Sequence, residues 1–208
     1  MIHPLILPSN GTILAVANPL AGVDKEIAGW FHAHLGQTVV NILKALTELG
    51  SGEWIGIALV GIIALLVWKR SWLAVGTLIV AVPGGMLLNE LLKLEVHRVR
   101  PFFADPFGDW SGYSFASGHT IGATLLYGQL ALLILPFIKT RQGRVLTLVA
   151  TTLLVLLVGF TRIALGAHYF TDVIGAIVLG TAWLTFCVFA AKPMRRAPAA
   201  VAAVENSR

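Results

Sequence analysis

Two histidines and an aspartate stand where long apolar segments meet polar connections. His168 precedes Asp172 by four residues in "TRIALGAHYFTD", so on a helix the imidazole and the carboxylate share one face. The carboxylate can accept one ring N–H, fix the tautomer and leave the other nitrogen as a nucleophile. We therefore treat His168 and Asp172 as candidate catalytic residues, although an ordinary His–Asp pair at a helix start gives the same pattern.

The stretch "SFASGHT" places Ser117 and Gly118 directly before a long apolar run, where their backbone N–H groups are expected at a helix N-terminus. Such a terminus binds anions, and glycine lets a phosphate approach the backbone closely. Ser117 can cap the helix and donate from its hydroxyl. His119 would then border the anion, but a routine serine cap with an interfacial histidine is the alternative.

Three basic residues accompany these groups. Lys93 and Arg100 are seven residues apart in "KLEVHRVRP", so they share one face of the helix if it continues to Pro101. Their long side chains could converge on one anion. Arg162 ends a later apolar segment at the same predicted membrane surface. The alternative is that these cations contact lipid head groups.

The neighbours of these cations are expected to have ordinary roles. His97 and Arg98 should point elsewhere on the same helix, as juxtamembrane residues. Glu90 lies three residues before Lys93 and is expected to form a local ion pair with it.

Two other chemistries fit part of this set. A hydrolase triad could use Ser117 as the nucleophile with His168 and Asp172, and a zinc ion could bind His119, His168 and Asp172. Both leave the three basic residues without a task, because acyl transfer needs an oxyanion hole rather than fixed cations. Positive side chains would also repel a dication.

The composition indicates that helices spanning a membrane position these residues. Of 208 residues, 57% are hydrophobic and only 12% charged, and the mean hydropathy is +0.82. Only helices or closed barrels satisfy their backbone in a bilayer, and about 20 apolar residues of helix cross it. We predict an all-α polytopic helix bundle. Its five spans lie in Trp54–Trp68, Ser71–Asn89, Thr120–Ile138, Val145–Thr161 and Val173–Ala191, the first needing preceding residues to reach across.

The net charge of +5 does not indicate nucleic acid, because the charges lie between spans. Clusters of Lys and Arg follow the first, third and fifth spans, at 69–70, 139–144 and 192–196. The positive-inside rule makes this side cytoplasmic and places the candidate site on the extracytoplasmic face.

The chain divides into three predicted parts. Residues 1–50 form an N-terminal arm with a short amphipathic helix in "DKEIAGWFHAHLG", lying in the interface or capping the bundle. A sixth span there is doubtful, since Pro4, Pro8 and Pro19 interrupt it. Residues 51–192 form the membrane core, and 193–208 a disordered cytoplasmic tail.

The ordered set of motifs resembles the type 2 phosphatidate phosphatase family, which shares its site with vanadium-dependent haloperoxidases. The family pattern KxxxxxxRP, PSGH and SRxxxxxHxxxD is matched by "KLEVHRVRP", "ASGH" and "TRIALGAHYFTD". Ala116 replaces a proline and Thr161 a serine, and neither change removes a catalytic group. The similarity covers about Leu46 to Ala191 and lacks the first of the usual six spans.

The resemblance implies a metal-independent reaction without a cofactor. His168 would form a phosphohistidine, oriented by Asp172, and His119 would protonate the leaving oxygen and then activate water. The phosphate would be held by Lys93, Arg100, Ser117, Gly118 and Arg162.

The resemblance also implies a lipid phosphate as substrate, in a bacterial inner membrane. Undecaprenyl diphosphate is the first choice. Phosphatidate, phosphatidylglycerol phosphate and lipid A phosphates are alternatives, and a non-hydrolytic lipid-phosphate transporter is an alternative of another class. A haloperoxidase is disfavoured because halide oxidation needs no spans. Aromatic residues of the loop before the second motif are expected to influence substrate choice or to anchor at the interface: Phe102, Phe103, Phe107, Trp110 and Tyr113. The oligomeric state stays open.

Overall fold

The computed structural model describes residues 19–101 and 112–205, with side chains described up to residue 191. These residues form helices and connections, and no strand occurs among them. The helices are α1 (Ala21–His34), α2 (Gln37–Thr47), the short η1 (Glu48–Gly50), α3 (Gly52–Trp68), α4 (Trp72–Val96), α5 (Gly118–Ile134), the short η2 (Leu135–Phe137), α6 (Arg141–Ala164) and α7 (Phe170–Glu205).

Five helical segments are long and apolar enough to cross a membrane, as predicted. They are Gln37–Trp68, Trp72–Val96, Gly118–Phe137, Arg141–Ala164 and Phe170–Ala191. Side chains on their outer faces are apolar and exposed, such as Ile57 at 70%, Val60 at 69% and Leu146 at 69%. Such continuous apolar surface is stable against lipid rather than water, so the chain is an integral membrane protein.

The first span is built from two helices rather than one. Ser51 has extended backbone angles and caps α3 by accepting the Trp54 N–H at 3.1 Å, so the chain bends between α2 and α3. The expectation that residues before Trp54 complete this span is confirmed. Helix α2 buries Val40, Leu43 and Thr47 on one face.

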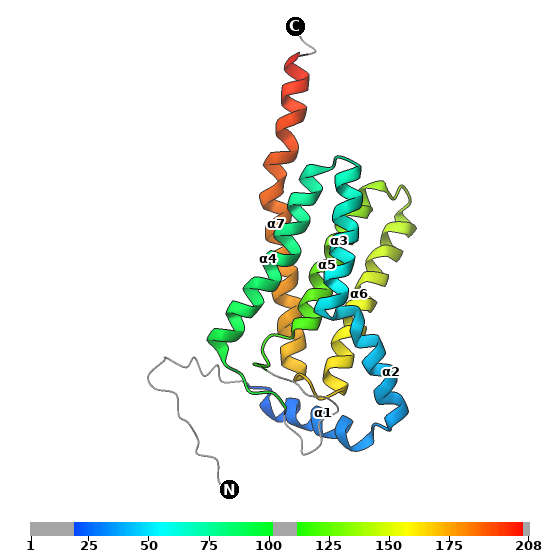
Figure 1. Ribbon diagram of the computed structural model, residues 1–208, viewed down its shortest axis with the longest axis vertical. Helices are drawn as coiled ribbons and strands as arrows, with labels where there is room; N and C mark the ends of the chain where they lie inside the picture. Colours follow the sequence, from blue (N-terminus) through cyan, green and yellow to red (C-terminus); the bar gives the residue numbers. More distant parts are fainter. Residues whose placement is uncertain (1–18, 102–111, 206–208) are drawn as a thin grey trace.

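Helix α5 lies at the centre of the bundle and packs against α4, α6 and α7 (Figure 1). Its Leu125 and Leu126 are fully buried and belong to a core that includes Leu78 and Val82 of α4. Close packing of such side chains resists displacement, so α5 provides a rigid base for the residues at its N-terminus.

Helix α4 ends at Val96 and does not continue to Pro101. His97 adopts a left-handed conformation (φ 50°) and donates its N–H to Lys93 O at 3.1 Å, which terminates the helix. The expectation that Lys93 and Arg100 share one face of a continuous helix is therefore wrong. Arg100 lies in the connection beyond the helix.

The predicted amphipathic helix is present as α1, which lies across one end of the bundle (Figure 1). Phe31 contacts Phe160 of α6 edge to face at 5.5 Å, and Leu35 packs against the buried cluster that contains Leu165. Helix α1 thus caps the bundle, while Trp30 stays 56% exposed. Residues 1–18 of the predicted arm lie outside the described residues. Helix α7 runs on to Glu205, through most of the segment that the sequence assigns to a tail.

Candidate active site

The predicted site residues come together at the end of the bundle that α1 covers. Because α4, α5, α6 and α7 alternate in direction, the C-termini of α4 and α6 and the N-termini of α5 and α7 meet there (Figure 1). The three sequence motifs lie at these four helix ends. Their convergence therefore follows from the up-and-down order of the spans.

His168 lies in a tight turn between α6 and α7. Gly166 has a φ of 68°, which favours glycine, and the His168 N–H donates to Arg162 O at 3.2 Å. His168 therefore precedes α7 instead of lying on it, yet its Nδ1 is 3.6 Å from Asp172 Oδ2. The opposite nitrogen, Nε2, faces Arg100 Nη1 at 3.2 Å.

The His168 ring is 2% exposed. Burial lowers the pKa of His168 to about 4, against the opposing effect of Asp172. The ring is therefore neutral at neutral pH. With Nδ1 turned toward the carboxylate, Nε2 carries the lone pair that can act as a nucleophile.

Asp172 is fully buried and its carboxylate has several donors. Oδ2 accepts the Tyr169 N–H at 2.9 Å and the hydroxyl of Ser114, and Oδ1 pairs with Arg98 Nη1. These donors keep the carboxylate charged and fixed beside His168.

The cations surround His119 and the start of α5. Lys93 Nζ lies so close to Gly118 that a Cβ there would be 3.4 Å from it, and the predicted ion pair with Glu90 is confirmed at 2.7 Å. Arg100 Nη1 donates to Ala167 O at 2.9 Å, beside its contact with His168. The positive charges of Lys93, Arg100 and Arg162 all act on His119.

Arg162 belongs to the last turn of α6 and is only 2% exposed. Its Nη1 donates to Thr47 Oγ1 of α2 at 3.1 Å, which helps to fix the orientation of the guanidinium. Beside it, η1 packs against the first turn of α5. A Cβ on Gly50 would be 2.8 Å from His119 O and 2.6 Å from a Val158 methyl, so this position needs glycine.

Ser117 occupies the N-cap position of α5, but its side chain does not cap the helix. Its Oγ instead accepts from Thr120 Oγ1 at 3.0 Å. The capping role predicted for Ser117 is therefore wrong. The Ser117 N–H donates to Asp172 O at 3.4 Å, which links the start of α5 to the start of α7.

Three residues of this network were missed or misjudged from the sequence. Arg98 was expected to point away, yet it pairs with both Asp172 and Asp24 because the left-handed turn at His97 redirects the chain. Asp24 of α1 and Ser114 belong to none of the three sequence motifs. Their contacts join residues 58 to 147 positions apart, which no local pattern indicates.

The motifs and this geometry agree with comparisons to known proteins. A model of the PAP2 superfamily matches residues 72–195, more than half of the chain. The chain belongs to the PAP2 superfamily. It is therefore a membrane phosphatase of the PAP2 type, and the family predicted from its motifs is confirmed.

The relatives of this PAP2 protein are phosphatases. Phosphatidylglycerophosphatase B of Bacillus subtilis is 34% identical over 145 residues, covering 67% of this chain and 68% of the relative. Lipid A 1-phosphatase of Rhizobium johnstonii is 35% identical over 132 residues, covering 58% and 49%. The crystal structure of a PAP2-type phosphatidylglycerolphosphate phosphatase from Bacillus subtilis superposes with a TM-score of 0.75 at 25% identity, covering 85% of this chain and 88% of that one.

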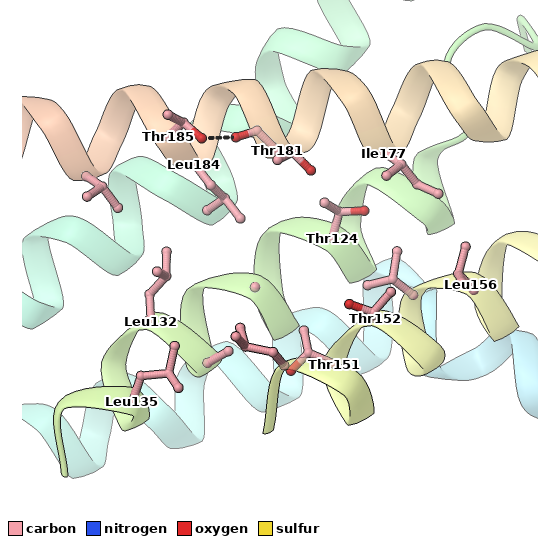
Figure 2. A pocket seen from close by; sticks show the side chains of 15 residues that line it. Thr124, Leu132, Leu135, Thr151, Thr152, Leu156, Ile177, Thr181, Leu184 and Thr185 are labelled. Carbon is pink, nitrogen blue, oxygen red and sulfur yellow. Dashed lines mark hydrogen bonds between the residues drawn. The ribbon is translucent and has the colours of Figure 1, made fainter. Parts of the chain in front are cut away.

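A groove of about 430 Å³ lies elsewhere on this PAP2 bundle, between α5, α6 and α7 (Figure 2). Its lining consists of Leu, Ile, Val, Ala, Gly and Thr side chains, among them Thr124, Thr152 and Thr181. None of these groups is titratable near neutral pH. The groove therefore has no acid, base or cation of its own, and the candidate chemistry stays at the α1 end.

The donor set beside His168 suits an anion better than a metal ion. Within residues 19–101 and 112–191, no three His, Cys, Asp or Glu side chains are grouped as metal ligands. The zinc site considered for His119, His168 and Asp172 is thus not assembled.

Of the loop aromatics, Phe102, Phe103, Phe107 and Trp110 lie outside the described residues. The ring of Tyr113 contacts His97 edge to face at 4.4 Å.

Proposed function

We propose that this PAP2 phosphatase hydrolyses the phosphomonoester or diphosphate of a membrane lipid through a phosphohistidine on His168. One observation carries the proposal. The Nε2 of the buried His168 faces Arg100, which can only donate, while its Nδ1 faces the carboxylate of Asp172. A nucleophilic nitrogen beside fixed cations suits attack on a phosphate, whose transfer requires positioning and compensation of charge.

In the first step, His168 Nε2 attacks phosphorus and the bond from phosphorus to the leaving oxygen breaks. His119 donates a proton to that oxygen, so the lipid leaves as an alcohol or a lipid monophosphate. The imidazole gains positive charge as the P–N bond forms. Asp172 offsets that charge at 3.6 Å.

In the second step, water attacks the phosphohistidine in line with the P–N bond. The neutral His119 takes a proton from the water as the P–N bond breaks, and phosphate leaves. His168 returns to its neutral form with Nε2 free. His119 ends the cycle protonated, ready to act as the acid again.

The equatorial oxygens would be held by Lys93, Arg100 and Arg162, with Gly118 N–H and the Ser117 hydroxyl. Lys93 Nζ next to Gly118 supports this role, because it directs an ammonium and a helix N-terminus to the same place. Three cations compensate the charge of the transferred group without a metal ion.

A second groove supports a substrate with an apolar tail. About 380 Å³ in volume, it lies between α4, α5 and α7. Its lining is Gly85, Leu88, Asn89, Leu92, Ile121, Leu179, Ala182, Trp183 and Phe186. Leu92 adjoins Lys93, and Asn89 donates to Ala116 O at 3.4 Å, next to Ser117. A lipid phosphate in the cradle could therefore extend its tail directly into this groove.

Undecaprenyl diphosphate is our first candidate substrate, cleaved on the extracytoplasmic face of a bacterial inner membrane. Basic residues at the opposite ends of the spans, such as Lys69 and Arg141, support this orientation. Phosphatidylglycerol phosphate and lipid A are the alternatives that the names of the relatives favour.

The test measures phosphate release in detergent micelles from undecaprenyl diphosphate, phosphatidate, phosphatidylglycerol phosphate and lipid A. His168→Ala serves as the blank. We expect release that is lost in the variant, fastest with undecaprenyl diphosphate. Binding of these lipids without release would instead indicate a carrier. Release by His168→Ala at the wild-type rate would exclude the phosphohistidine.

A further inference from the structure

One guanidinium lies between two buried carboxylates at the edge of the candidate site. Arg98 Nη2 is 2.7 Å from Asp24 Oδ2, and Nη1 pairs with Asp172 Oδ1. Asp24 is 1% exposed and Asp172 fully buried. The Arg98 Cζ also lies 4.5 Å from the centre of the Tyr169 ring. The planar cation is thus held in one orientation and shared by two anions.

Asp24 is also bonded to the chain immediately before Asp172. Its Oδ1 accepts the Thr171 N–H at 3.0 Å, and its Oδ2 accepts the Thr171 hydroxyl at 2.5 Å. These bonds join α1 to the first turn of α7. Because α1 precedes the segment 72–195 that matches the family, the family motifs do not include this carboxylate.

The shared cation affects the charge that His168 experiences. A buried carboxylate is stable only when donors or cations compensate it, and Asp24 takes part of the compensation that Arg98 provides. Asp172 therefore keeps more of its negative charge for the imidazole. If Asp24 lost its charge, the whole guanidinium charge would act on Asp172 and oppose the positive charge that forms on His168.

We propose that Asp24 is a positioning residue of this phosphatase: it holds Arg98 against Asp172 and so sets the orientation and charge of the His168–Asp172 pair. The inference rests on the proposed function, in which His168 is the nucleophile. The hydrogen bonds and the ion pair described for Asp24 reach Arg98 and Thr171, which are not among the residues of the proposed phosphate cradle. Loss of Asp24 should therefore affect the chemical step more than substrate binding.

Asp24→Asn tests this role, because it keeps the size and one acceptor oxygen but removes the charge. Glu26→Gln is the matched control, since Glu26 is exposed on the same helix. The substrate is p-nitrophenyl phosphate, which has no lipid tail. We expect kcat to fall about tenfold to a hundredfold in Asp24→Asn, by analogy with the carboxylates that orient metal-bound histidines. KM should change by less than about threefold, and the control should match the wild type. A kcat within about twofold of the control would overturn the proposal.

A double-mutant cycle tests whether Asp24 acts through Arg98. In Arg98→Ala, adding Asp24→Asn should cause no further loss of kcat, because the link is already broken. If the two losses multiplied, Asp24 would act independently and the proposal would be wrong. Thermal unfolding of the same four proteins gives a second cycle that needs no turnover: non-additive shifts of the midpoint support the link, and additive shifts contradict it.

Failure of the proposed function has a different signature. It would appear as no wild-type release from any lipid of the panel. The cycles with p-nitrophenyl phosphate and with thermal unfolding would still decide the role of Asp24.

Discussion

Replacing Asp172 with Asn should nearly abolish turnover while leaving the protein folded. At the 3.6 Å between Asp172 Oδ2 and His168 Nδ1, opposite unit charges attract by about 5 kcal/mol with an effective dielectric constant of about 20. This attraction is available when the imidazole becomes positive during attack on phosphorus. Its loss corresponds to a fall in kcat of about 10³-fold. An amide that donates to Nδ1 would also favour the tautomer with hydrogen on Nε2, which blocks the nucleophile.

The assay is phosphate release by Asp172→Asn in detergent micelles at saturating substrate. Arg98 keeps its ion pair with Asp24 in this variant, so we expect a monodisperse protein with a thermal midpoint close to that of the wild type. Glu53→Gln, an exposed position at the start of α3, controls for the removal of a carboxylate. A loss of kcat smaller than about tenfold in a folded Asp172→Asn protein would refute the role of this carboxylate.

Five further outcomes are expected. Gly50→Ala should lower the thermal midpoint, because its Cβ would be 2.8 Å from His119 O, at a cost of about 1–3 kcal/mol in the free energy of unfolding. Gly56→Ala is the control, since the space around Gly56 is open. Equal midpoints for the two variants would contradict the packing argument. Arg100→Lys keeps the charge but loses the planar guanidinium that reaches both Gly112 O and His168 Nε2. The kcat/KM should therefore fall about tenfold to a hundredfold. Unchanged kinetics would exclude the contact between Arg100 and His168 from the mechanism. Burial lowers the pKa of His168 to about 4, so the acid limb of the pH profile of kcat/KM should lie near that value. Since the unfolded chain takes up this proton first, the folded protein should also lose stability as the pH falls from about 6.5 toward 4, and thermal unfolding across this range would show it. Activity should survive EDTA, and full dependence on a divalent ion would defeat the three-cation mechanism.

The fold could be predicted from the sequence because hydropathy identifies the helices that span a membrane. Each of the five spans is a long apolar run bounded by polar residues, and the alternating direction of the spans brings the three motifs to one end. Helix α2 is not among the predicted elements, because residues 37–47 were assigned to the N-terminal arm. Its buried positions Val40, Leu43 and Thr47 recur at helical spacing, so the sequence does carry a signal for this helix.

The limits of sequence reasoning lie where contacts join distant segments. Arg98 stands in the first motif and was dismissed because a straight helix would turn it away, whereas the left-handed residue His97 turns it toward Asp172. No periodicity indicates that Asp24 would be buried 147 residues before its partner Thr171. Ser117 shows the opposite error: its position at the helix start was correct, but Thr120 competes for its hydroxyl.

The gathering of every candidate catalytic group at one end of the spans makes the protein asymmetric across a membrane (Figure 1). A lipid phosphate in the opposite leaflet would have to cross the bilayer before it could reach His168. In sealed vesicles with uniformly oriented protein, hydrolysis of a lipid substrate should therefore stop once the facing leaflet is exhausted. Further turnover would then proceed at the rate of transbilayer lipid movement, so the phosphatase would report flipping between leaflets.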